Sequence, residues 1–232
     1  MGTGSSGERV ERLLRQFGLG EDDRAAWEAS GLDGGAFDDW LTDRVARRPG
    51  GQRARRVYGA EDVHDFARVA ILDALALQPG DRLLEIGCGG GLLLRDALTT
   101  RAAVTGLDHS AEMVEVARQT AESAALLIAD ARRLPFLDHS FTAVAMSVVF
   151  FFFSEPVSVL RECRRALTAG GRLAVYTTGP ELRGTPASPE PLASRGHFYE
   201  DAALASLAEE AGFTEARVVN QRGGQLLTAR LG

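Results

Sequence analysis

The chain has 232 residues, of which 45% are hydrophobic and 25% charged, and its formal net charge is −6. This composition is typical of an ordinary globular protein with one sizeable core. The acidic balance disfavours nucleic acid as a partner, because phosphate backbones attract basic surfaces. Cys88 and Cys163 have no paired spacing, so neither a disulfide framework nor a metal cluster is indicated. Lysine is absent, which excludes Schiff-base chemistry.

Nothing in the sequence predicts an attachment to a membrane. The longest strongly apolar stretch, 143–153, is about half of what a spanning helix needs. The Gly/Ser-rich stretch 1–7 reads as a flexible tail and not as a signal peptide. Six arginines between Arg44 and Arg56 are interpreted as a solvated helix face and loop. We therefore expect a soluble cytoplasmic protein, either a monomer or a homodimer.

Helical spacing of apolar residues dominates the part of the chain that precedes Pro79. Segments 9–17, 23–30, 37–48 and 60–77 each place apolar residues on one helical face, and glycines separate them. We expect residues 8–78 to form a helical cap or lid. Residues 79–232 are then expected to form the core domain.

From residue 81 onward, short apolar runs alternate with helical segments. Near-continuous apolar strands of this kind indicate a parallel sheet that is covered on both faces, and right-handed crossovers make it doubly wound. The expected strands are 83–86, 103–107, 126–129, 143–149, 172–176, 215–219 and 225–231, and the expected helices are 92–98, 111–120, 157–167 and 201–211. The predicted fold is a Rossmann-like α/β sheet of seven mostly parallel strands. An antiparallel C-terminal hairpin, turning at 222–224, closes the sheet, and the helical extension precedes it.

The segment 83–91, Leu-Leu-Glu-Ile-Gly-Cys-Gly-Gly-Gly, runs from a buried strand into a glycine loop before a helix. Gly87 and Gly89 let the backbone turn sharply and approach a ligand without Cβ obstruction. A dinucleotide fingerprint requires a third glycine where Leu92 stands. Glu85 would also repel a pyrophosphate, so the loop favours a ligand that carries an amino group or a cation.

Two further acids end the next two predicted strands. Asp108 can accept hydrogen bonds from both hydroxyls of a ribose, and Ser110 already supplies the cap for the helix that follows. Asp130 can accept a hydrogen bond from the exocyclic amine of adenine, and Met113 and Leu134 can pack against the purine. We expect the carboxylates of residues 85, 108 and 130 to converge on one crevice.

With these motifs the chain resembles the class I S-adenosylmethionine-dependent methyltransferases, particularly the small-molecule group called type 11, over residues 57–231. The resemblance implies S-adenosyl-L-methionine as the cofactor, with Glu85 at its methionine part, Asp108 at its ribose, and Asp130 with the Ala131 amide at its adenine. The cofactor-binding residues expected on this basis are Glu85, Gly87, Gly89, Asp108, His109, Met113, Asp130, Ala131 and Ser147.

The sequence departs from the family pattern after the fourth strand, where Phe151 and Phe152 stand in place of two common histidines. The four-phenylalanine run 150–153 to which they belong forms either strand-end core or an apolar wall near the transferred methyl group. Thr142 and Ala169 replace a common Asp and Pro at structural positions. None of these changes argues against the family.

The resemblance implies methyl transfer to an O, N or C atom of a small molecule, with bacterial secondary metabolism as the expected setting. His197 is the candidate for a general base, followed by His64 and Tyr58. The helical extension and the loop 179–196 are expected to cover the acceptor. The alternative is a protein of this fold that binds the cofactor without transferring a methyl group, either for a cyclisation or for binding alone.

Overall fold

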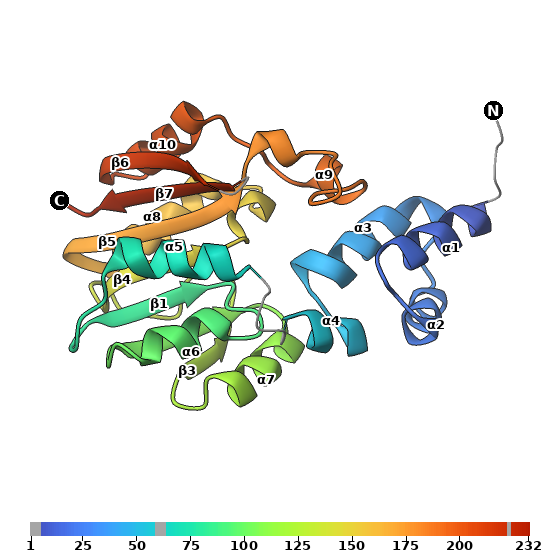
Figure 1. Ribbon diagram of the computed structural model, residues 1–232, viewed down its shortest axis with the longest axis horizontal. Coiled ribbons are helices and arrows are strands. Elements are labelled where there is room, and N and C mark those ends of the chain that lie inside the picture. Colours follow the sequence, from blue (N-terminus) through green and yellow to red (C-terminus); the bar gives the residue numbers. More distant parts are fainter. Residues whose placement is uncertain (1–5, 59–63, 222–223) are drawn as a thin grey trace.

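The computed structural model describes residues 6–58, 64–221 and 224–232 and contains one seven-stranded sheet in the order β3-β2-β1-β4-β5-β7-β6 (Figure 1). The strands are β1 (Arg82–Ile86), β2 (Ala103–Asp108), β3 (Ala125–Ile128), β4 (Phe141–Ser147), β5 (Leu167–Thr178), β6 (Thr214–Gln221) and β7 (Gly224–Arg230). β1 to β5 pair in parallel, whereas β7 runs antiparallel to both β5 and β6. The predicted fold, including the closing hairpin, is confirmed.

Helices cover both faces of the sheet, because alternate residues of its central strands point to opposite sides. Leu84 and Ile86 of β1 join one buried cluster with helices α8 and α10, whereas Leu83 joins another with α5 and α6. The helices of this core are α5 (Asp65–Leu75), α6 (Leu92–Leu98), α7 (Ala111–Thr120), α8 (Pro156–Ala166) and α10 (Asp201–Glu210). The predicted helices 92–98 and 111–120 coincide with α6 and α7.

The N-terminal helices form a separate layer with a small apolar core of their own (Figure 1). Phe37 and Leu41 are fully buried there, and Trp27 and Trp40 pack against the ring of Phe37. This layer consists of α1 (Ser6–Gln16), α2 (Glu21–Ala29), the 3-10 turn η1 (Gly34–Ala36), α3 (Phe37–Thr42), the π-helical turn η2 (Asp43–Arg47) and α4 (Gly51–Tyr58). Helix α1 begins at Ser6, so the expected tail loses its last two residues to a helix.

The structure divides the single helix expected over 37–48 into α3 and η2. The Thr42 hydroxyl donates to the Asp38 carbonyl, 2.8 Å away, and such bonds to the preceding turn bend helices. The wider π turn leaves the Val45 carbonyl to accept a hydrogen bond from the Tyr58 hydroxyl at 3.0 Å. The arginine cluster was expected as a helix face and a loop. Its later members, Arg53, Arg55 and Arg56, lie in a further helix, α4.

Helix α4 depends on a contact with the core domain that local sequence does not reveal. The Gly51 amide donates to both carboxylate oxygens of Glu112 in the first turn of α7, at 3.0 and 2.9 Å. Ala54 is fully buried. The predicted helix 60–77 appears as α5, and the residues 59–63 before it lie outside the described residues, as do 222 and 223 of the predicted turn.

The loop after β5 contains the 3-10 turn η4 (Pro180–Leu182) and the short helix α9 (Leu192–Arg195), and a further 3-10 turn, η3 (Phe150–Phe152), follows β4. Helix α9 lies beside α3 of the N-terminal layer (Figure 1). Within the described residues, no helix combines the length and apolarity required to cross a membrane.

Candidate active site

A cavity of about 970 Å³ lies between the sheet and the N-terminal layer. Its floor comes from the carboxyl ends of β1, β2, β4 and β5, the edge at which ligands of doubly wound sheets bind. Val45 and Tyr58 belong to its roof, and Leu182 and Leu192 of the loop after β5 close another side. Segments from both ends of the chain therefore enclose one ligand-sized space.

The glycine loop after β1 forms part of the cavity floor. The amides of Gly87 and Cys88 donate to the Leu107 carbonyl, at 2.8 and 3.0 Å, so the loop is tied to β2. Gly87 has φ +70°, and a Cβ there would approach Cγ2 of Val149 to 2.8 Å. A side chain at this position would be strained by both the backbone conformation and the contact.

Glu85 is buried on the same floor and is only 2% exposed. Its Oε2 atom has no hydrogen-bond partner in the described part of the chain. Burial, and secondly the charge of Asp108, raises the pKa of Glu85 well above its usual range. A buried acceptor without a partner is costly, so this oxygen is suited to a donor supplied by a ligand.

Asp108 closes β2 and is 6% exposed. Its Oδ2 accepts from the Gly89 amide at 3.0 Å, and its Oδ1 accepts from the Ser110 amide at 2.8 Å. Burial raises the pKa of Asp108, although these two hydrogen bonds oppose the effect. One carboxylate therefore fixes the glycine loop relative to the start of α7.

The other sequence-predicted residues on the cavity wall are His109, Met113 and Ser147. His109 lies beside Asp108, with 3.9 Å between Nδ1 and Oδ1. Met113 is fully buried, and its amide donates to the Ser110 side chain at 3.3 Å, the predicted cap of α7. Ser147 is the last residue of β4.

Asp130 and Ala131 do not line the cavity. The Asp130 side chain is 52% exposed, and the Arg132 guanidinium donates to both of its oxygens. These contacts lower the pKa of Asp130 to about 2. The expected convergence of three carboxylates therefore holds for Glu85 and Asp108 alone, because a neighbour two residues away holds the third at the surface. Leu134, expected at the purine, lies in the core.

The four-phenylalanine run contributes to both the core and the cavity. Phe150 is fully buried and packs edge to face against Phe153, with ring centroids 6.0 Å apart. Phe151 and Phe152 line the cavity, and their ring centroids are 4.1 Å apart. The two interpretations of this run thus apply to different members of it.

The structure also shows which of the candidate bases line the cavity. The His197 side chain is exposed and does not line the cavity, because its backbone amide is held by the Phe151 carbonyl at 2.7 Å. His64 and Tyr58 do line it. These two were expected after His197, because no local pattern shows which of the three side chains faces the cavity.

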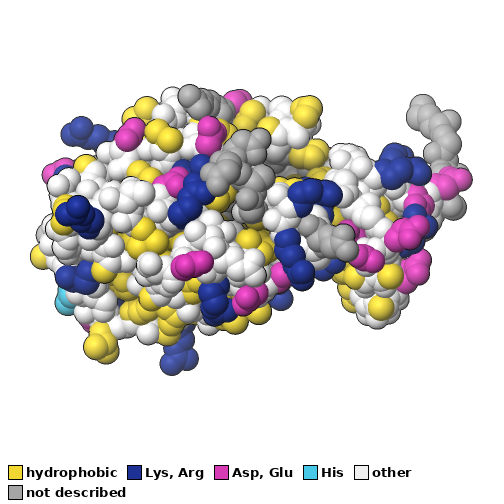
Figure 2. Space-filling view, turned by 60° about the horizontal axis from the view of Figure 1, so that its bottom comes forward, with side chains coloured by type: hydrophobic (Ala, Val, Ile, Leu, Met, Phe, Trp, Pro, Cys, Tyr) yellow, Lys and Arg dark blue, Asp and Glu magenta, His cyan; other side chains and the backbone are white. Residues whose placement is uncertain are grey.

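The arginine cluster of the N-terminal layer is partly neutralised by carboxylates of the same chain. On the face in Figure 2, basic and acidic side chains are mixed over both the core and the N-terminal layer. Several of the arginines are held by carboxylates of the same chain, in the pairs Arg44–Asp23, Arg47–Asp43 and Arg55–Glu112.

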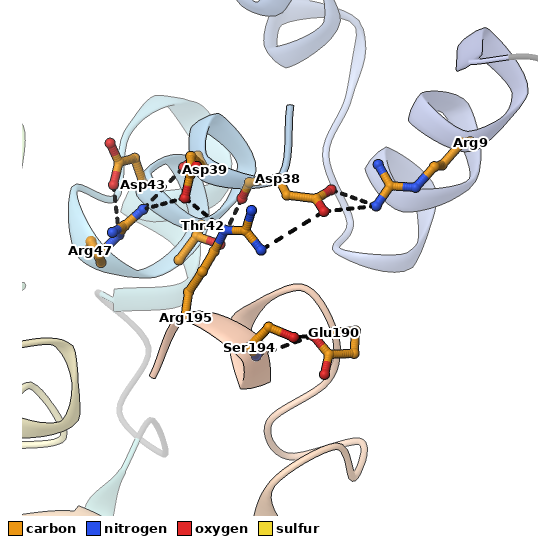
Figure 3. A network of polar contacts seen from close by, with 9 residues as sticks. All are labelled: Arg9, Asp38, Asp39, Thr42, Asp43, Arg47, Glu190, Ser194 and Arg195. Atoms are coloured by element: carbon orange, nitrogen blue, oxygen red, sulfur yellow. Dashed lines mark hydrogen bonds and ion pairs between the residues drawn. The ribbon is translucent and has the colours of Figure 1, made fainter. Parts of the chain in front are cut away.

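Arg195 joins two segments that are far apart in sequence (Figure 3). From α9, its Nε donates to Asp39 at 2.7 Å, and its Nη1 lies 3.8 Å from Asp38 of the same helix, α3. Asp38 also pairs with Arg9 of α1 at 2.7 Å. The hydrogen bond from Arg195 lowers the pKa of Asp39. This network is a polar link between the loop after β5 and the N-terminal layer.

We expect Arg195→Glu to loosen this link, because it places three carboxylates together. The loss of an exposed pair and the added repulsion amount to about 1 kcal/mol, so amide hydrogen exchange in residues 180–195 should accelerate by roughly fivefold. Arg161→Glu is the matched control, since Arg161 makes an exposed pair with Glu210 away from the cavity. Equal exchange rates in the two variants would show that Arg195 does not hold the loop.

The fold and the site together define a class of protein. A doubly wound sheet closed by an antiparallel β7, with an acid before its glycine loop and another at the end of β2, is the architecture of class I methyltransferases. Residues 84–175 match the family model described as a methyltransferase domain. In its fold and in this domain, the chain is similar to the class I S-adenosylmethionine-dependent methyltransferases.

Known relatives agree with this assignment. A demethylmenaquinone methyltransferase of Thermotoga maritima is 38% identical over 104 residues, which are 43% of this chain and 44% of that protein. The chain thus spans about half the length of the first curated relatives it matches. A SAM dependent methyltransferase from Aquifex aeolicus has a similar structure, with TM-score 0.66, 21% identity, and coverage of 78% of this chain and 97% of that one. The [4+2]-cyclase SpnF is also similar, with TM-score 0.62, 22% identity, and coverage of 73% and 82%.

Proposed function

We propose that the chain transfers the methyl group of S-adenosyl-L-methionine to an O, N or C atom of a small molecule. The observation that carries this proposal is the buried Glu85, whose Oε2 lacks a partner, beside a glycine floor tied to Asp108. Such a site offers negative charge to a ligand with an amino group and a positive sulfur. The acceptor is expected in the remaining, apolar part of the cavity, and a setting in bacterial secondary metabolism stays a prediction.

The cradle fits the cofactor in its chemistry. Glu85 with the loop of Gly87 and Gly89 would hold the methionine part, Asp108 the ribose hydroxyls, and Met113 the purine. His109 and Ser147 would contact it from the ends of β2 and β4. The contribution expected of Asp130 and Ala131 to adenine binding stays a prediction. When bound, the cofactor supplies an activated methyl group, and the protein orients the acceptor and excludes water.

We further propose that the N-terminal layer, the part of the predicted lid 8–78 that precedes α5, acts as a lid on the core, to which α5 itself belongs. The support is that Val45 and Tyr58 roof the cavity, while Arg195 joins the loop after β5 to α3. Tyr58 also packs against the glycine loop, where its backbone carbonyl leaves no room for a Cβ on Gly90. The lid residues and the cofactor cradle are thus in direct contact.

Titration calorimetry of the full chain with S-adenosylmethionine and S-adenosylhomocysteine tests the cofactor assignment. We expect saturable binding of both, and an absence of binding would refute the proposed function. Turnover is tested by the formation of S-adenosylhomocysteine with a panel of acceptors, including demethylmenaquinone because of the relatives' names. Cofactor that binds but yields no S-adenosylhomocysteine with any acceptor would favour the alternative of a non-methylating reaction or binding alone.

A further inference from the structure

His64 lines the same cavity as Glu85 and Asp108 but comes from a different part of the fold. It precedes α5, which packs on β4 and β5, whereas Glu85 and Asp108 stand at the ends of β1 and β2. Two ring contacts connect the imidazole to the sheet. The ring centroids of His64 and Phe66 are 6.3 Å apart, and those of Phe66 and Tyr176 of β5 are 5.6 Å apart. The imidazole therefore lies beside the carboxyl end of β5.

The imidazole of His64 is held there without a hydrogen bond to any other described residue, and it lines the cavity. Its backbone is left-handed, with φ +52°, a conformation that costs a non-glycine residue about 1 kcal/mol or more and is concentrated at functional sites. Burial, and secondly the charge of Arg68, lowers the pKa of His64. The ring is consequently neutral at physiological pH and able to accept a proton.

The other titratable groups on the cavity wall, within the described residues, are less suited than His64 to accept a proton. Tyr58 donates its hydroxyl proton to Val45, and burial raises its pKa to about 12. Glu85 and Asp108 belong to the cofactor cradle, and His109 lies beside Asp108. The charged and titratable groups that share the cavity wall with His64 are Arg68 from α5, Glu85 from β1, Cys88 from the glycine loop, Asp108 and His109 from the end of β2, Tyr176 from β5, and Arg47, Arg53 and Tyr58 from the N-terminal layer.

We propose that His64 is the general base for an acceptor that presents a hydroxyl group on a flat apolar ring. The proposal rests on the proposed methyl transfer. The apolar walls formed by Phe151 and Phe152 suit such a ring. The acceptor oxygen gives its proton to the free imidazole nitrogen and forms a bond to the methyl carbon. The electron pair of the breaking carbon–sulfur bond stays on sulfur and neutralises its positive charge.

The test compares two probes of the same shape, 1-naphthol and naphthalene-1-thiol, since a thiol needs little help from a base. For His64→Asn we expect kcat/KM for the naphthol to fall by about 100-fold or more, and for the thiol by less than about threefold. In the wild type, kcat/KM for the naphthol should rise with pH through a pKa below that of free imidazole. His197→Asn, the same substitution outside the cavity, should leave both values unchanged.

A second readout does not depend on turnover. The ring resonances of His64, assigned by their loss in His64→Asn, should shift when 1-naphthol is added to the protein and should not respond to naphthalene. Four outcomes would overturn the proposal: equal losses for both probes, a loss in His197→Asn instead, no response of the His64 ring, or no methylation of naphthol by a protein that binds the cofactor. A protein that fails to bind the cofactor would instead refute the proposed function.

Discussion

Asp108→Asn is expected to weaken the binding of S-adenosylmethionine by about 10- to 150-fold, the equivalent of about 1.5–3 kcal/mol for lost charge-assisted hydrogen bonds. The carboxylate accepts from Gly89 with one oxygen and from Ser110 with the other. An amide has a single acceptor oxygen, so one of these two N–H groups faces a donor in the variant. The glycine loop loses an anchor, and the proposed ribose contact loses its charge. Titration calorimetry measures the change.

Asp138→Asn provides the control for Asp108→Asn. Asp138 is a 64% exposed acid paired with Arg165, and it does not line the large cavity. We expect its replacement to leave the cofactor affinity within about twofold, as is usual for surface changes. If Asp108→Asn bound the cofactor as tightly as the wild type, the proposed cradle would be wrong.

Glu85→Gln should have opposite effects on stability and on cofactor binding. Glutamine keeps the shape of the side chain but cannot ionise, whereas folding of the wild type near pH 7 must protonate Glu85 or bury its charge. The free energy of unfolding of the free protein should therefore rise by about 1–3 kcal/mol, since each unit of pKa shift is equivalent to about 1.4 kcal/mol. The affinity for S-adenosylmethionine should fall about tenfold, because a neutral acceptor binds an ammonium group less strongly. Urea unfolding and calorimetry measure the two quantities.

The pH dependence of that stability gain follows from the direction of the pKa shift. The pKa of Glu85 is raised in the folded protein, so ionisation favours the unfolded chain. Below about pH 4.3 the carboxyl is protonated in both states, and the variant should match the wild type. The gain should appear above that pH and grow until the folded group ionises. Glu122→Gln, at an exposed position, should show no such gain. A Glu85→Gln variant that is less stable than the wild type at pH 8 would contradict the argument.

The sequence by itself determined the architecture of the core. The apolar runs and helical spacings that predicted strands and helices are local patterns, and helices 92–98 and 111–120 appear with the expected limits. The glycine loop and the acids at 85 and 108 were also predictable, because parallel strands bring their carboxyl ends to one edge of the sheet. The strand order then placed both acids on the floor of one cavity.

The direction of Asp130, the helix α4 and the position of His64 rather than His197 on the cavity wall were decided only by the tertiary structure. Asp130 turns to Arg132, α4 depends on Glu112 of a distant helix, and Arg195 reaches two aspartates more than a hundred residues away in the chain. The physical reason is the distance in sequence over which each kind of interaction acts. Backbone sterics and apolar periodicity act between neighbours in sequence and can be read there. Ion pairs, caps and cavity walls depend on which segments meet in space, and no local pattern specifies those meetings.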